Sequence, residues 1–138
     1  MSALPSMSEA ALNEIGICFM IFLVAPTSTD ARLELIAKRA SGFIYAVSRA
    51  GVTGTRDSVS SEAEKLVDRV RRFSDLPIAV GFGISTSEQV LDVQRYADAA
   101  VVGSAIVQEL ERNAGAPDIS KRIGAFARNL LPVKSLRA

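Results

Sequence analysis

The sequence predicts an α/β fold in which four parallel strands alternate with helices. Three observations carry this prediction. Four short apolar runs are continuous rather than alternating, which is typical of strands in a parallel sheet that helices cover. Amphipathic stretches with helical periodicity separate these runs. Most connections between them are short, as in strand–helix units with right-handed crossovers.

The four apolar runs are the expected strands. They are Ile21–Ala25 (IFLVA), Phe43–Val47 (FIYAV), Pro77–Phe82 (PIAVGF) and Ala99–Val102 (AAVV). The first lies in a longer apolar run, Ile15–Ala25, which is far shorter than the roughly 20 residues that a membrane span requires. The residues before that run carry Glu9 and Glu14 but no Lys or Arg, the reverse of a secretory leader. We therefore expect a buried strand there and no membrane segment.

Helical patterns lie between and after these strands. Apolar positions recur with helical spacing over Ala31–Arg39, over Ser61–Phe73, through Val90, Leu91 and Val93, and over Ala105–Glu111 and Ile119–Leu130. Candidate N-caps of the first helix are Ser28, Thr29 and Asp30, and Gly42 follows it as a stop. Two pairs stand at the spacing of a capping box, Ser61 with Glu64 and Ser85 with Glu88.

We expect one domain over residues 1–138, because no Gly-, Ser- or Pro-rich linker divides the chain. Two arrangements fit four strand–helix units: an open doubly wound sheet, or half of an eight-stranded barrel. A complete barrel of that kind needs about 250 residues, and the smallest need about 200, so this chain is too short to form one. The order of the elements alone does not choose between the two arrangements.

The composition excludes several classes of function. Apolar residues make up 49% of the chain and charged residues 22%, the balance of an ordinary globular protein. A net charge of +1 gives no field that would attract nucleic acid or an anionic membrane. The chain has one cysteine, Cys18, and no histidine, which excludes His-based triads, His metal sites and Cys clusters. Cys18 lies in an apolar run, where we expect a buried, unreactive thiol, and we expect a cytoplasmic protein.

Glycine-bearing turns follow the third and fourth strands, at the edge where parallel sheets bind ligands. Gly81 and Gly83 let the backbone approach a ligand closely, and Gly83 can take a positive φ. Gly103 and Ser104 open a helix, whose free N–H groups and positive dipole end attract anions. Together the two turns can form a phosphate nest without a lysine. The alternative is plain turn chemistry, because the third Gly of a dinucleotide fingerprint is missing.

Three further features have two interpretations each. The connection Ser48–Ser60 is about twice the usual length and is either a mobile lid or an inert loop. Tyr45 either reaches a ligand with its hydroxyl or belongs to the core. Phe82 either stacks on an apolar ligand or fills the interior.

Catalytic carboxylates are missing from the expected site. None of the four strands contains Asp or Glu, Asp30 serves better as a helix cap, and Asp57 lies within the long connection. A general acid/base pair would project from strand ends into the pocket. We therefore predict no catalytic residue and no metal site in this chain.

Four segments together resemble the α subunit of tryptophan synthase, in that family's order and with nearly its spacing. They are FLVAPTSTD (Phe22–Asp30), SGFIYAVSRAGVTGTR (Ser41–Arg56), LPIAVGFGIS (Leu76–Ser85) and VVGSAIV (Val101–Val107). The similar region runs from about Leu4 to Val107. Each motif alone is weak, and the combination is highly specific.

The resemblance implies a fold, a reaction and a set of site residues. The family is a complete (β/α)8 barrel that cleaves indole-3-glycerol phosphate to indole and glyceraldehyde 3-phosphate by a retro-aldol reaction. It passes indole to a β subunit, which holds the pyridoxal phosphate, so the resemblance implies no cofactor in this chain. By resemblance the phosphate ligands are Gly54, Gly83, Gly103 and Ser104. The residues at the indole end are Tyr45, Thr53 and Phe82, and the closing lid is Arg49–Ser60.

The chain departs from the family in length. Its four strands resemble strands five to eight of the family barrel, so the early strands that carry the catalytic Glu and Asp have no counterpart here. We expect a C-terminal half-barrel that is inactive alone and that self-associates through exposed strand edges. The surface that contacts the β subunit is also largely in the other half. The alternative is a non-catalytic half-barrel that binds a phosphorylated ligand and pairs with another chain. A different phosphate-binding barrel enzyme would need a carboxylate or Lys at a strand end, which the sequence lacks.

Overall fold

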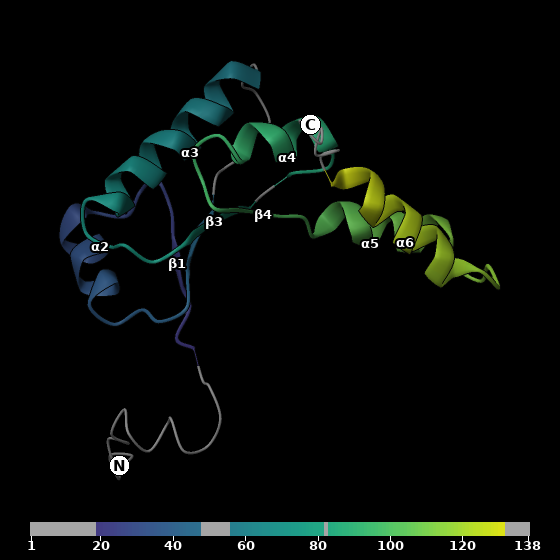
Figure 1. Cartoon of the computed structure of the whole chain (residues 1–138), viewed down its shortest axis with the longest axis horizontal. Helices are drawn as coiled ribbons and strands as arrows, with labels where there is room; N and C mark the ends of the chain where they lie inside the picture. The colour runs from purple at the N-terminus through teal and green to yellow at the C-terminus, as the bar shows by residue number, and fades with distance from the viewer. Residues whose placement is uncertain (1–18, 48–55, 82, 132–138) are drawn as a thin grey trace, which may run out of the picture.

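The computed structural model describes residues 19–47, 56–81 and 83–131 (Figure 1). Within them four parallel strands form one sheet, in the order β1-β2-β3-β4. The strands are β1 (Phe22–Val24), β2 (Ile44–Val47), β3 (Ile78–Gly81) and β4 (Ala99–Val101). Each lies inside one of the four apolar runs, so the predicted strand–helix order is confirmed.

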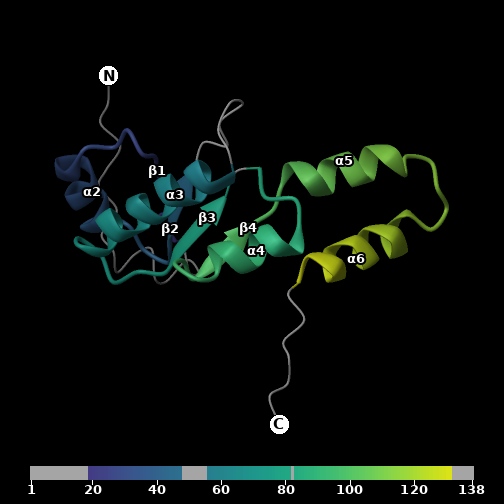
Figure 2. The same cartoon turned by 90° about the horizontal axis from the view of Figure 1, so that it is seen from above.

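The helices follow the strands as expected. They are α2 (Asp30–Ala37), α3 (Arg56–Arg71), α4 (Ser87–Val93), α5 (Ser104–Arg112) and α6 (Ile119–Leu130). Figure 1 shows α2, α3 and α4 along one face of the sheet. Figure 2 shows α5 and α6 packed as a pair that extends beyond β4. None of the helices in the described part of the chain is long and apolar enough to cross a membrane.

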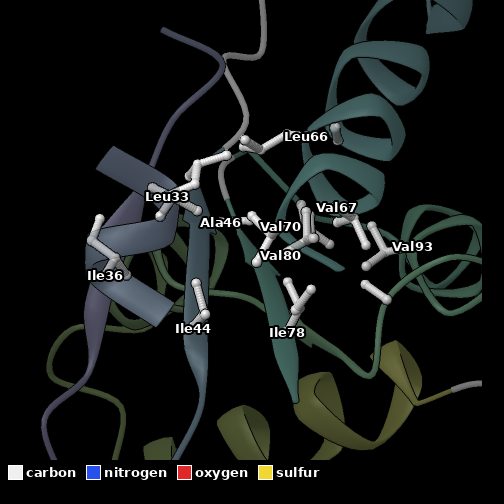
Figure 3. Packing of buried hydrophobic residues seen from close by; sticks show 14 of the residues in the cluster. Leu33, Ile36, Ile44, Ala46, Leu66, Val67, Val70, Ile78, Val80 and Val93 are labelled. Atoms are coloured by element: carbon white, nitrogen blue, oxygen red, sulfur yellow. The ribbon is translucent and has the colours of Figure 1, made fainter. Parts of the chain in front are cut away.

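The hydrophobic core lies between the sheet and these helices (Figure 3). Alternate residues of the strands point into it, because side chains alternate between the two faces of a sheet. The strand residues in the core are Val24, Ile44, Ala46, Ile78 and Val80, and they pack against Leu33, Ile36, Leu66, Val67, Val70 and Val93. Burying each of these larger side chains contributes about 1.5–3 kcal/mol, so this layer is the main source of stability.

Burial on both faces holds for only part of the sheet. Every residue of β3 is buried, whereas the outer strands expose Leu23 and Ala99. The expectation that all four runs are covered on both faces was therefore wrong for β1 and β4. The physical reason is that α2, α3 and α4 lie along one face of the sheet, so a side chain such as Leu23, which points to the other face, is left exposed.

The helix starts agree with the sequence in one case and differ in two. Thr29 caps α2, as one of the three candidates, by accepting from the amide of Arg32 at 3.3 Å. Helix α3 begins at Arg56, so Ser61 lies inside it and is not an N-cap. The capping box of α4 is one residue later than expected, with Thr86 and Gln89 in place of Ser85 and Glu88. This shift places Val90 and Val93 on the buried face of α4.

Asp98 ties the elements together at the amino-terminal edge of the sheet. Its carboxylate accepts from the Ile78 amide at 2.8 Å and pairs with the guanidinium of Arg71 at the end of α3. The hydrogen bond from Ile78, and then the charge and hydrogen bond of Arg71, hold the pKa of Asp98 below its usual value, although partial burial opposes them. This carboxylate stabilises the fold at the edge opposite to the expected site.

Candidate functional site

The carboxyl ends of three strands finish level with one another. Val47 pairs with Gly81, and Gly81 pairs with Val101, across β2, β3 and β4. Gly83 and Gly103 each follow two residues after a paired position, so both turns leave the sheet at the same edge. Gly83 has a φ of 68°, the left-handed conformation that a glycine is free to adopt.

Helix α5 begins at this edge on a glycine. Gly103 is the N-cap and makes no side-chain hydrogen bond, unlike Thr29 and Thr86 at the starts of α2 and α4. The first bond within α5 runs from the Ile106 amide to the Gly103 carbonyl at 3.0 Å. The amides of Ser104 and Ala105 precede that bond and lie at the positive end of the helix dipole.

Open space surrounds Gly103 on its side-chain side. A Cβ placed on this residue would meet no heavy atom within 4 Å. A ligand can therefore approach the backbone here as closely as the absence of a side chain allows. This arrangement is suited to an anion that accepts from main-chain amides.

Tyr45 lies on the face of the sheet that points away from the core. Its neighbours Ile44 and Ala46 are buried in the core, so Tyr45 must point to the other side. A Cβ on Gly81 would lie only 2.2 Å from the Tyr45 hydroxyl oxygen, so that hydroxyl rests directly over Gly81. Tyr45 therefore does not belong to the core cluster, and its role toward a ligand stays a prediction.

Leu23 joins Tyr45 on this face, and sequence reasoning missed it. The two residues are paired in register across β1 and β2, and Leu23 is 63% exposed. Leu23 also lines an open hollow of about 450 Å³ at the end of β1, together with Val24, Ala25, Thr27, Ser28, Arg32 and Val47. The signal available in the sequence was the period of two, which puts Leu23 opposite to the buried Val24.

Arg69 of α3 holds the turn between β1 and α2. Its guanidinium donates to the Pro26 carbonyl at 3.1 Å, to the Ser28 carbonyl, and to the Asp30 carboxylate at 2.7 Å. Asp30 is therefore engaged in an ion pair as the first residue of α2, which agrees with its exclusion as a catalytic acid. No local pattern reveals this contact, because 39 residues separate Arg69 from Asp30.

Three of the expected site residues lie outside the described residues: Thr53, Gly54 and Phe82. Residues 49–55 of the expected lid also lie outside them. The expectation that the loop extends to Ser60 was wrong, since residues 56–60 belong to α3. Among the described side chains, no group of three or more His, Cys, Asp or Glu could hold a metal ion.

Comparison with known families gives a match over nearly the whole chain. The family model described as tryptophan synthase alpha chain matches residues 4–131. The chain is 46% identical over 121 residues to the tryptophan synthase alpha chain of Solibacter usitatus, covering 88% of this chain and 45% of that one. It is 50% identical over 112 residues to that of Methanosarcina mazei, covering 80% and 40%.

Solved structures of tryptophan synthase alpha chains are similar in fold over most of this chain. A tryptophan synthase complex from Pyrococcus furiosus matches with a TM-score of 0.70 at 30% identity, over 88% of this chain and 46% of that chain. A tryptophan synthase subunit alpha from Campylobacter jejuni matches with a TM-score of 0.69 at 30% identity, over 91% and 52%. The chain thus spans less than half the length of the curated relatives it matches, and its four strand–helix units are similar to part of a TIM barrel.

Proposed function

This chain belongs to the tryptophan synthase alpha chain family, and from that premise we propose that it is the phosphate-binding half of an indole-3-glycerol phosphate lyase. The whole reaction releases indole and glyceraldehyde 3-phosphate in tryptophan biosynthesis. The observation that carries the proposal is the common edge of the Gly83 and Gly103 turns, set by the level pairing of Gly81 with Val101. A substrate phosphate bound there accepts from the amides of Gly83, Gly103 and Ser104, with Gly54 as a further donor.

The proposed indole end of the substrate lies on the face that carries Tyr45. The exposed side chain of Leu23 supports an apolar surface beside it. Thr53 and Phe82 complete this end in the proposal. Such a division, with charge at the glycine turns and apolar side chains beside them, suits a ligand that has an anionic tail and an aromatic head.

In this proposal the chain binds the substrate phosphate but does not catalyse the lyase reaction on its own. The acidic residues that the structure describes near the sheet have other partners: Asp30 pairs with Arg69, and Asp98 lies at the opposite edge. Loss of one acid/base group lowers a rate by roughly 10²–10⁴-fold. Chemistry then needs a second polypeptide segment that supplies the carboxylates, and the pyridoxal-phosphate-dependent β subunit is the proposed partner of the assembled enzyme. A single cysteine supports a cytoplasmic setting for it.

A non-catalytic role, in which the half-barrel binds a phosphorylated ligand for another chain, is the second candidate. The same absence of Asp and Glu from the four strands favours it. The two candidates share the phosphate site and differ in whether indole appears when the missing carboxylates are supplied.

Titration with glycerol phosphate by calorimetry tests the shared site. We expect saturable binding with a dissociation constant of about 1 mM, because all the proposed main-chain donors belong to this chain. Gly103→Ala should weaken binding by about tenfold, since its Cβ occupies the open approach to the amides without touching the protein. Gly124→Ala in α6 is the matched control, because its Cβ meets only Arg128 at 3.6 Å.

Two results would overturn the proposal. One is a titration without saturable heat in the unchanged chain, which removes the phosphate site. The other is indole release from indole-3-glycerol phosphate by this chain alone, which shows that it holds an acid/base pair after all.

A further inference from the structure

Both outer strands of the sheet have an unpaired side within the described residues. The order β1-β2-β3-β4 makes β1 and β4 the edges, and all neighbouring strands run parallel. At β4 the Asp98 amide donates to the Ile78 carbonyl at 3.0 Å, so the next amide, that of Ala99, points away from β3. Rows of free amides and carbonyls at an edge are templates for pairing with another strand.

The β1 edge is also unusually apolar. Phe19, Met20, Ile21 and Leu23 are exposed by 56%, 55%, 40% and 63%. The Met20 carbonyl accepts from the Ser41 amide at 3.0 Å, so the chain before β1 runs beside the segment before β2 and lengthens the edge strand. Ile21 and Leu23 alternate along it and share the face that carries Tyr45. A contiguous exposed apolar surface of this kind marks a site of association.

The solved relatives indicate the shape of what covers this surface. This chain matches 46% of the Pyrococcus furiosus chain, so a segment of about its own size completes that fold. A TIM barrel has eight parallel strands, and this sheet has four. A rotation of 180° about the barrel axis brings β4 of one copy beside β1 of a second copy, and the reverse, with both new pairs parallel. Such a closed two-fold arrangement leaves no free edge.

We propose that two copies of this 138-residue chain close into one eight-stranded parallel barrel. Leu23 of each copy then faces the barrel interior, and the Ala99 amide of each copy donates across the β4–β1 seam. Because all eight strands run the same way, both Gly103 turns open at one mouth of the barrel. This association goes beyond the proposed lyase role: the second copy takes the place that the segment with the carboxylates takes in the lyase, and the association holds whether or not phosphate binds.

Mass measurement of the full chain in solution tests the proposal. Sedimentation equilibrium over about 1–100 µM should give twice the chain mass of 14.7 kDa. Leu23→Asp should raise the dissociation constant by about tenfold or more, because it puts a charge into the barrel interior. Leu35→Asp is the matched control: Leu35 is 50% exposed on α2, which covers the face of the sheet opposite to Leu23, and the dimer should persist.

A second variant separates barrel closure from simple stacking of two sheets. Ala99→Pro removes a donor from the free edge without touching the bond between Asp98 and Ile78. We expect it to weaken the dimer by about tenfold or more, with the circular dichroism of the chain unchanged. A monomer at the highest concentration, an open series of larger species, or a dimer that Leu23→Asp breaks and Ala99→Pro leaves intact would each overturn the proposal.

Discussion

At the scale of single residues, Gly81 shows how one backbone position shapes the candidate site. The Tyr45 hydroxyl occupies the space where a side chain at position 81 would begin, and Val101 lies 3.0 Å from the same point. Only a glycine leaves that space to the tyrosine. Tyr45 is therefore positioned by what position 81 lacks as much as by its own packing.

Gly81→Ala should lower the free energy of unfolding by about 1–3 kcal/mol, the usual cost of overpacking. The added methyl group must displace the Tyr45 ring, which lies within 3 Å of it. In a Tyr45→Ala background the same change should cost less, with a coupling of about 0.5–3 kcal/mol in a double-mutant cycle measured by chemical denaturation. Strictly additive effects would contradict the contact.

At the scale of elements, one side chain joins α3 to the turn that precedes α2. Arg69 binds two carbonyls and a carboxylate of that turn while its own side chain is only 26% exposed. The planar guanidinium satisfies acceptors in several directions at once, which a lysine cannot do. The clamp fixes the rim of the hollow beside Leu23.

Arg69→Met should loosen the turn between Pro26 and Asp30. We expect amide exchange in this segment, including the Ser28 amide that donates to the Ala25 carbonyl at 2.8 Å, to accelerate by about tenfold. The loss of charge-assisted bonds should also cost about 1–2 kcal/mol of stability. Arg95→Met is the control, because Arg95 is 79% exposed and pairs at 3.4 Å with Asp92, three residues earlier in the chain. Mass spectrometry measures the amide exchange in both variants. Equal exchange rates of the Pro26–Asp30 segment in the two variants would argue against a clamp.

At the scale of the whole molecule, the carboxyl and amino ends of the parallel strands carry different features. The carboxyl edge carries the glycine turns, and the amino edge carries the contacts of Asp98 with Ile78 and Arg71. The contacts of Asp98 that stabilise the fold thus lie at the end of the strands opposite to the proposed ligand site, a division of roles that TIM barrels also show.

The pKa of Asp98 predicts how stability depends on pH. Because the folded pKa is lowered, the carboxylate stabilises the fold above the unfolded value of about 3.9, and that stability is lost as the pH falls through the folded pKa. Asp98→Asn should cost about 1 kcal/mol at pH 7, a value reduced for solvent screening because the side chain is 46% exposed. The difference from the unchanged chain should shrink below about pH 4.

Urea denaturation at a series of pH values measures this effect. Asp92→Asn is the matched control, since Asp92 makes an exposed ion pair with Arg95, just beyond the end of α4. It should change stability by less than about 0.5 kcal/mol at any pH. A difference for Asp98→Asn that is constant from pH 7 to pH 3 would contradict the assigned role.

Local pattern in the sequence was enough to predict the strand–helix order and the glycine turns that follow β3 and β4. The four apolar runs contain the four strands, α6 has the predicted bounds, and Gly83 adopts the left-handed φ that its lack of a side chain allows. These features depend on residues close together in the chain, whose periodicity and backbone freedom are readable directly. The errors of one to five residues at the starts of α3 and α4 arose where several hydroxyl residues compete as caps.

The tertiary structure alone decided which side chains meet. The position of Tyr45 over Gly81, the clamp of Arg69 on Asp30 and the tie of Asp98 to Ile78 join residues that are 20 or more positions apart. Leu23 became a candidate site residue only because β1 is an edge strand with one face open. Such contacts depend on the relative placement of whole elements, which local periodicity does not encode, because burial and pairing arise only when distant segments pack together.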